Sequence, residues 1–475
     1  MDDRGSKVGN GKSIKLQTIT LFSATALLLS NTGGGSIFIA STSMLIYGGS
    51  PGVALIFWLV GGLLNFGLAF CYIEVALLLP KSGGAYYYVK EVFGAFPAFV
   101  LLWGFIFTIG APAWALSSYT AALYVITMLF PECPPPDVAT KVLAAWFMVT
   151  MIVLNCLYMK YVIRVQALLS AGKMIAMLII IAACLTAIGS SSNVDNINAM
   201  FRGSTTDPGN IALGLASGYF AFGGWQMISL IIEEVENPLV NVPRALIITF
   251  TTLILLSVFV NLCYFVVLPA RDVLLSDAVA VLYGFRIHPA LAVVISILVT
   301  TCSVSVLNSL ILGQPRMIFA AGREEEMPAI CGMISMKYLT PWPATFVLSI
   351  PALLVLTSGT VMSFIDMMGM YRNLITCAVL VCLLRLRWTH ADVKRRFKVP
   401  LMLPVFELLL SLGVLVMSVW KKPAELGTCI AVIAAGVPVY VVFILWESKP
   451  RCFKSLIGRW TCCLQKLFYL VKPDS

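Results

Sequence analysis

Long apolar segments alternate with short polar connections along almost the whole chain. A helix needs roughly 20 residues to cross the hydrocarbon core of a bilayer, and twelve segments approach or exceed this length. The ninth and eleventh are the short ones. The pattern predicts an all-α polytopic membrane protein with 12 transmembrane helices. The approximate bounds are 16–46, 52–78, 96–128, 140–158, 165–188, 210–232, 244–268, 290–320, 343–357, 361–383, 404–420 and 427–446.

Glycines interrupt the first of these segments. Residues 30–38 read Ser-Asn-Thr-Gly-Gly-Gly-Ser-Ile-Phe, and each glycine costs a helix about 1 kcal/mol relative to alanine. Since every freed N–H and C=O in lipid must find a partner, an unwound turn here is expected to line a cavity. The amides that begin the next half-helix would attract a small anion such as a carboxylate. The alternative is a glycine notch for a neighbouring helix.

A second glycine interruption lies in segment six, which reads Phe-Ala-Phe-Gly-Gly-Trp over residues 220–225. Segments one and six begin two blocks of five segments with opposite orientation. Matching interruptions in two inverted halves indicate a transporter site near the middle of the membrane. The dipoles of the broken helices predict which backbone groups bind an amino acid there. They are the amides around Gly34, Gly35 and Ser36 for its α-carboxylate, and the carbonyls of Phe220, Ala221 and Gly223 for its α-ammonium group.

Composition and charge agree with a membrane protein. Of the 475 residues, 60% are hydrophobic and 11% are charged, which argues against a soluble protein. Much of the net charge of +10 lies in the arm before segment one, the loop after segment ten and the tail. Because basic residues accumulate in cytoplasmic loops, both termini are expected in the cytoplasm. The positive charge then indicates contact with anionic lipid rather than binding to nucleic acid.

Two cations lie deep within apolar segments. Lys173 is about 12 Å along segment five, so its ammonium group should face the bundle and meet carbonyls or a carboxylate. The alternative is that its side chain snorkels to the surface. Arg372 lies near the centre of segment ten, where a guanidinium costs about 3 kcal/mol or more. Its planar fork fits a carboxylate, either on a substrate or on another helix. Asp366 is about 240° away around the same helix and cannot be a same-face partner.

These features favour a secondary transporter over other classes of membrane protein. The sequence contains no selectivity-filter motif, and no clustered nucleophile, metal set or acid–base pair, so neither a channel nor an enzyme is expected. The thirteen cysteines include no CxxC pair, which argues against zinc. No cofactor is expected. A scaffold protein would explain the apolar content but not Lys173 or Arg372.

Several motifs resemble the light chains of heteromeric amino acid transporters, an L-type family in the amino acid–polyamine–organocation superfamily. The resemblance covers about residues 15–450, and the particular set of substitutions is similar to the aspartate/glutamate- and cystine-transporting member. The motifs are Cys71-Tyr72-Ile73-Glu74, Pro80 to Tyr88, Glu91 to Gly94, Arg164-Val165-Gln166, Phe220 to Trp225, Glu233-Glu234 with Asn237-Pro238, and Gly322-Arg323-Glu324.

The resemblance implies a LeuT-like fold, with a 5+5 inverted repeat and broken helices 1 and 6. It also implies sodium-independent amino acid exchange at the plasma membrane, with a disulfide-linked heavy-chain glycoprotein of the rBAT type or a related one. A neutral amino acid exchanger, or a facilitative transporter of the same family, is the alternative. The expected parts are a cytoplasmic arm (1–15), the two repeats (16–188 and 189–383), the last two helices with a preceding basic loop (384–446) and a cytoplasmic tail (447–475).

The resemblance also implies roles for single residues. Phe220 would be an aromatic gate over the substrate, although ordinary packing would explain it too. Gln226 and Trp225 would line the lower pocket, although Trp225 could equally be a core residue. Lys173 matches a lysine that stands where related transporters bind sodium. Arg372 replaces an uncharged residue of the neutral amino acid carriers, which points to aspartate, glutamate or cystine. Ser36 departs from the family's Gly-Ser-Gly-Ile-Phe pattern by adding a side chain.

The extracellular loop after segment three contains Cys133 between prolines. The oxidising exterior favours a disulfide there, and no internal partner is obvious, so an intermolecular bond is expected. The resemblance identifies the partner as the heavy chain. The alternative is a free, buried thiol.

Three acidic residues at helix ends have less distinctive expectations. Glu74 is expected to be structural, near the cytoplasmic end of segment two. Glu233 and Glu234 either clamp cytoplasmic helix ends or are solvated.

Overall fold

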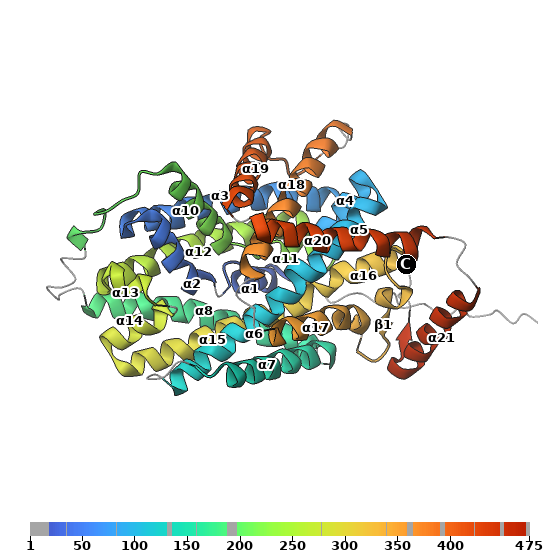
Figure 1. Cartoon of the computed structure of the whole chain (residues 1–475), viewed down its shortest axis with the longest axis horizontal. Coiled ribbons are helices and arrows are strands. Elements are labelled where there is room, and N and C mark those ends of the chain that lie inside the picture. Colours follow the sequence, from blue (N-terminus) through green and yellow to red (C-terminus); the bar gives the residue numbers. More distant parts are fainter. Residues whose placement is uncertain are drawn as a thin grey trace, which may run out of the picture.

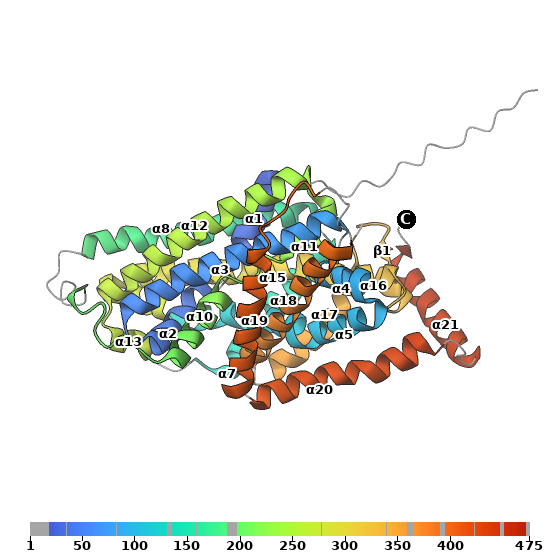
Figure 2. The same cartoon turned by 90° about the horizontal axis from the view of Figure 1, so that it is seen from above.

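The structure, a computed structural model, is a bundle in which most of the long helices run along one axis, whereas α19 runs across it (Figures 1 and 2). Its elements are almost all helical, which confirms the predicted all-α class. It describes residues 19–34, 36–81, 83–130, 135–157, 159–187, 197–276, 278–338, 340–358, 364–389, 395–421, 423–446 and 451–471.

Within these residues, eight helices or continuous helical runs are long and apolar enough to cross a membrane. They are α3 (Pro51–Leu78), α5 to α6 (Ala95–Leu129), α7 (Asp137–Leu157), Val165–Ala187 of α8 (Met159–Ala187), α12 (Pro238–Val267), α15 to α16 (Pro289–Arg323), Met367–Thr389 of α18 (Phe364–Thr389), and Leu426–Leu445 of α20 (Pro423–Tyr440) with η5 (Val441–Leu445).

Four of the twelve predicted segments are not among these eight runs, and each still contains helix. Two are the interrupted segments, which form the pairs α1 (Leu21–Asn31) with α2 (Ser36–Gly48), and α10 (Pro208–Ala221) with α11 (Met227–Leu230). The other two are the short ones, α17 (Trp342–Thr357) and α19 (Met402–Lys421). The twelve spans and the inverted repeat stay predictions.

Shorter elements connect the long helices. They are α4 (Ala85–Phe93), η2 (Ile232–Glu234), α13 (Ala270–Leu274), α14 (Val279–Ile287), η3 (Ala329–Gly332) and α21 (Arg451–Phe468). The π-helical η1 (Ile106–Gly110) lies between α5 (Ala95–Phe105) and α6 (Ala111–Leu129). Helix α15 (Pro289–Gly313) is followed by α16 (Pro315–Arg323). Strand β1 (Ile334–Ser335) pairs antiparallel with β2 (Leu470–Val471), which brings the end of the chain to the loop between α16 and α17.

Helix starts follow local sequence signals. Ser50 precedes Pro51 at the start of α3, and its hydroxyl accepts a hydrogen bond from the Val53 amide. Asp207 precedes Pro208 at the start of α10 and accepts from the amides of Gly209 and Asn210. Both follow the preference for a small polar cap followed by proline.

The helix interruptions lie where the glycines predict them. Between α1 and α2, Gly33 has a φ of +68°, and between α10 and α11, Gly224 has a φ of +108°. Residues with a Cβ rarely adopt these left-handed conformations. A Cβ on Gly224 would also lie 2.2 Å from the Asn31 carbonyl oxygen, so glycine is needed where the two interruptions approach each other.

Helices α3 and α10 meet backbone to backbone. A Cβ on Gly61 would lie 2.5 Å from the Gly218 carbonyl carbon, and one on Gly218 would lie 2.5 Å from the Phe57 carbonyl oxygen. One turn along α3, the Asn65 Nδ2 donates to the Tyr219 carbonyl at 2.8 Å. Small residues allow this kind of close packing between helices in a membrane.

Candidate substrate site between the interrupted helices

The two interruptions bond directly to each other. The Gly33 amide donates to the Gly223 carbonyl at 2.8 Å, and the Asn31 side-chain amide donates to the Gly224 carbonyl at 2.9 Å. Backbone groups that leave a helix in lipid need partners of this kind. The glycine-rich stretches of residues 32–34 and 222–226 therefore form one joint region in the middle of the bundle, near the labels α1 and α11 in Figures 1 and 2.

Several groups predicted to bind a substrate backbone already take part in the turns of this region. The Gly34 amide donates to the Asn31 carbonyl at 3.3 Å, and the Phe220 carbonyl accepts from the Gly223 amide at 3.1 Å. Ala221 is buried at the end of α10. Gly35 and the side chain of Ser36 lie outside the part of the chain that the structure describes.

Two further residues brace the second interruption. The Gln226 Oε1 accepts from the Gly224 amide at 3.0 Å. Trp225 is buried, and its indole N–H donates to the Asn65 Oδ1 at 3.2 Å. Of the two interpretations of Trp225, lower pocket or core, the structure supports the core.

Arg372 reaches this region from α18. Its guanidinium carbon lies 4.9 Å from the centre of the Phe220 ring, a cation–π contact. A Cβ on Gly223 would lie 2.0 Å from the Arg372 Nη1. Three predicted site residues from two distant stretches are thus in contact, and Gly223 leaves the space that the guanidinium occupies.

The Arg372 guanidinium has no ion pair or hydrogen bond with any side chain that the structure describes. The side chain of Asp366 lies outside that description. A cation without a carboxylate beside two broken helices is an arrangement that can receive an anionic group from a ligand.

Lys173 bonds to the backbone at the end of α1, where the first interruption begins. Its Nζ donates to the Thr32 carbonyl at 2.6 Å and to the Leu29 carbonyl at 3.1 Å, and the residue is 1% exposed. The ammonium group therefore sits at the negative end of the α1 dipole. It meets carbonyls inside the bundle as its depth predicted, and the snorkelling alternative is wrong.

A family model described as amino acid permease matches residues 19–445. The chain belongs to the amino acid permease family. It is 33% identical to the human large neutral amino acids transporter small subunit 2, over 98% of this chain and 87% of the relative. It is 30% identical to the human Asc-type amino acid transporter 1 (99% and 90%) and 31% identical to the human cystine/glutamate transporter (96% and 91%).

These relatives confirm the resemblance to the L-type light chains. The permease is a multi-pass membrane protein that transports amino acids, and it is not an enzyme, as the sequence predicted.

The permease contains a buried polar network beside Lys173 that was not predicted as a network, although Gln166 belongs to one of the motifs and Ser30 precedes the glycine run. The Gln166 Nε2 donates to the Ser30 hydroxyl at 2.5 Å and to the Ser305 carbonyl at 3.2 Å, while its Oε1 accepts from the Asn308 Nδ2 at 2.6 Å. Asn155 donates to the Asn308 Oδ1 at 2.7 Å. The network joins α1, α7, α8 and α15. Polar residues within apolar segments were the available signal.

A buried ion pair joins α16 to η2, the short helix that follows α11. Arg316 of α16 makes a bidentate ion pair with Glu234, with Nε–Oε1 at 2.8 Å and Nη2–Oε2 at 3.0 Å. The Glu234 carbonyl also accepts from the Ile19 amide at 2.6 Å. Glu234 is therefore buried and paired rather than solvated, whereas the neighbouring Glu233 is exposed. A clamping role at the cytoplasmic side stays a prediction.

A second group of ion pairs joins α4 to the loop after α16. The Lys90 Nζ lies 2.7 Å from Glu324 and 3.1 Å from Glu326, and the Tyr86 hydroxyl donates to Glu326 at 2.7 Å. The hydrogen bond from Lys90 holds the pKa of Glu324 below its usual value. Glu324 thus takes part in joining these elements.

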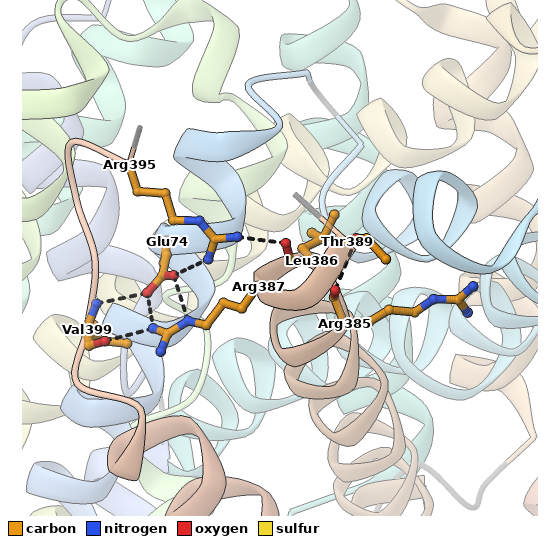
Figure 3. Close-up of polar contacts among 7 residues, drawn as sticks. All are labelled: Glu74, Arg385, Leu386, Arg387, Thr389, Arg395 and Val399. Atoms are coloured by element: carbon orange, nitrogen blue, oxygen red, sulfur yellow. Dashed lines mark hydrogen bonds and ion pairs between the residues drawn. The ribbon is translucent and has the colours of Figure 1, made fainter. Parts of the chain in front are cut away.

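Glu74 of α3 is held by two arginines (Figure 3). Its carboxylate accepts from Arg387 at 3.0 and 2.5 Å, from Arg395 at 2.8 Å and from the Val399 amide at 2.8 Å. Arg387 and Arg395 also donate to the carbonyls of Val399 and Leu386. The structural role expected for Glu74 agrees with these contacts, and its side chain is fully buried.

Cys133 lies outside the described residues. The heavy-chain disulfide therefore stays a prediction.

Proposed function

We propose that the permease is a sodium-independent exchanger of anionic amino acids, aspartate and glutamate, and of cystine. The observation that carries the proposal is the Arg372 guanidinium beside Phe220 and Gly223. A carboxylate on the substrate side chain, or the distal carboxylate of cystine, would pair with it in a bidentate contact. A large neutral side chain would leave the guanidinium buried and unpaired, which costs several kcal/mol.

The backbone of the amino acid would bind at the two interruptions. Its α-carboxylate meets the amides around Gly34, Gly35 and Ser36, and its α-ammonium group meets the carbonyls around Phe220, Ala221 and Gly223. Gln226 holds the second turn through its bond to the Gly224 amide. Binding in this position exchanges some of the hydrogen bonds within the turns for bonds to substrate, which couples substrate binding to the geometry of both broken helices.

Lys173 accounts for independence from sodium in this proposal. Its ammonium group bonds to the Thr32 and Leu29 carbonyls. A fixed positive charge at the end of α1 offers these carbonyls what a bound cation would offer.

The remaining parts of the proposal concern assembly and orientation. The permease works by alternating access as a light chain, with twelve spans in a LeuT-like 5+5 repeat and both termini in the cytoplasm. Cys133 joins it to a heavy-chain glycoprotein of the rBAT type or a related one at the plasma membrane.

A neutral amino acid exchanger is the second candidate. It is favoured by the 33% identity to the large neutral amino acids transporter small subunit, against 31% for the cystine/glutamate transporter. The difference is small and averages over the whole chain, whereas Arg372 acts at the site itself.

Uptake by Arg372→Asn tests the proposal. We expect aspartate, glutamate and cystine uptake to fall more than about tenfold, which corresponds to a loss of about 1.4 kcal/mol or more of substrate stabilisation. The amount of protein at the cell surface, measured by surface biotinylation, should not change. Arg372→Lys keeps the charge but not the fork and should recover only part of the uptake. Arg385→Asn is the matched control, because Arg385 lies in the same helix over the Phe93 ring at 5.1 Å.

A second variant tests the position of the charge without removing it. Gly223→Ala would push the Arg372 guanidinium aside, since the new Cβ takes the place of Nη1. We expect acidic substrates to lose uptake more than neutral ones do. Undiminished glutamate and cystine uptake in Arg372→Asn would reject Arg372 as the group that binds the substrate carboxylate. Uptake of neutral but not acidic amino acids by the wild-type protein would support the neutral exchanger.

A further inference from the structure

Helix α21 separates apolar from basic positions around its circumference. At 100° per residue, Leu464, Leu467 and Phe468 lie within about 80° of Trp460. Arg459 and Lys466 lie more than about 90° away from it. The sequence contains no acidic residue from 451 to 471. An amphipathic helix with a basic polar face is typical of a segment that lies in a membrane surface.

Most of the apolar face has no cover within the described part of the chain. Trp460 is 62% exposed and Leu467 is 65% exposed. At its end, the Phe468 ring lies 5.8 Å from that of Trp342 and 6.4 Å from that of Phe346. Phe346 is itself exposed, one turn into α17. The apolar face of α21 therefore adjoins an outward-facing apolar surface of the bundle.

The position of α21 is fixed at both ends. Five residues separate Leu445, the end of the last long apolar run, from the start of α21 at Arg451, and a chain of that length spans less than about 20 Å. After α21, Leu470 and Val471 pair with β1. Figures 1 and 2 show the helix at the end of the bundle beside β1. It is thus kept near the level at which the last run leaves the membrane.

We propose that α21 lies in the membrane surface at this end, with its apolar face in the acyl boundary and its basic face toward anionic lipid headgroups. The inference rests on membership of a membrane-protein family and not on the substrate. Under the orientation proposed above, the leaflet is the cytoplasmic one, which carries the anionic lipids. Burial of Trp460 and Leu467 supplies the apolar part of the binding, and Arg459 and Lys466 supply the lipid selectivity.

Two adjacent cysteines provide a built-in probe of this arrangement. Both Cys462 and Cys463 are exposed. Cys463 lies about 60° from Trp460 around the helix, at the margin of the apolar face, whereas Cys462 lies about 160° away. Docking in the membrane would shield Cys463 and leave Cys462 open to water.

The experiment uses the full-length protein in nanodiscs of phosphatidylcholine with phosphatidylserine. A charged, membrane-impermeant maleimide is added, and peptide mass spectrometry reads both cysteines in the same sample. We expect Cys462 to react at least about tenfold faster than Cys463. The difference should shrink in phosphatidylcholine alone and in Arg459→Gln/Lys466→Gln.

A matched pair of variants tests the apolar face. Trp460→Glu should make Cys463 as reactive as Cys462, whereas Ser455→Glu, which adds the same charge on the exposed polar face, should leave Cys463 shielded. Equal reactivity of the two cysteines in the phosphatidylserine discs would overturn the proposal. Shielding that does not depend on lipid composition would also overturn it, because it would indicate cover by protein. None of these readouts requires transport, so failure here is distinct from failure of the proposed substrate.

Discussion

Replacing Glu74 by glutamine tests how much a charge cluster contributes to the stability of the bundle. In the cluster of Figure 3, Arg387 and Arg395 share one carboxylate, so the three side chains carry an excess of one positive charge. Glu74→Gln leaves two guanidinium groups together without a counter-charge. Arg395→Gln instead leaves a neutral pair of Glu74 with Arg387.

The contacts set the expected magnitudes. Glu74 accepts four hydrogen bonds between 2.5 and 3.0 Å, three of them from guanidinium groups. Removing one partner of a buried ion pair costs about 3–5 kcal/mol. Arg395→Gln removes one bond to the carboxylate and one to the Leu386 carbonyl and leaves no uncompensated charge, so we expect about 1–3 kcal/mol.

Thermal unfolding in detergent, followed by size-exclusion chromatography, measures this order. Glu74→Gln should lower the midpoint more than Arg395→Gln does. The double variant Glu74→Gln/Arg395→Gln should unfold at a higher temperature than Glu74→Gln alone, because the second substitution removes one of the two unpaired guanidinium charges. Glu236→Gln, at an exposed carboxylate, is the control. A double variant less stable than Glu74→Gln, or a Glu74→Gln midpoint equal to that of the control, would refute the charge argument.

Two predictions concern the transport cycle and the partner. Lys173→Met keeps the length of the side chain but leaves the Leu29 and Thr32 carbonyls without its ammonium group, at a cost of about 1–3 kcal/mol each. Uptake should fall while surface delivery persists, and wild-type uptake should be unchanged when choline replaces sodium; a strict sodium requirement would reject the role of Lys173. Non-reducing gels should show a larger band with the heavy chain that is lost in Cys133→Ser, and a band that survives in the mutant would exclude this site.

The sequence predicts the features of the fold that depend on local composition. Glycine runs locate both interruptions, and apolar length locates the helices around them. Lys173 and Arg372 lie deep within apolar segments, so the sequence shows that each needs a partner. It does not show which partner, because the cost of a charge in lipid is the same whichever group pairs with it.

Features that depend on distant contacts could not be predicted in this way. Glu74 was expected to be structural, but its partners could not be named from the sequence, because Arg387 and Arg395 lie more than three hundred residues away. Gln166 occurs in a recognisable motif, but nothing local indicates that it joins Ser30 to Asn308.

The backbone contact between Gly61 and Gly218 has a consequence for motion. The Phe57 side chain of α3 also packs over Gly214 of α10, and Asn65 adds a hydrogen bond between the two helices, so α3 and α10 would move as one rigid body. Flexing of the sixth segment would then be confined to the stretch after Ala221, where the helix is already unwound. That hinge contains the carbonyl of Gly223 and borders the guanidinium of Arg372. A ligand bound there would contact the hinge directly, and its dissociation would allow the hinge to move.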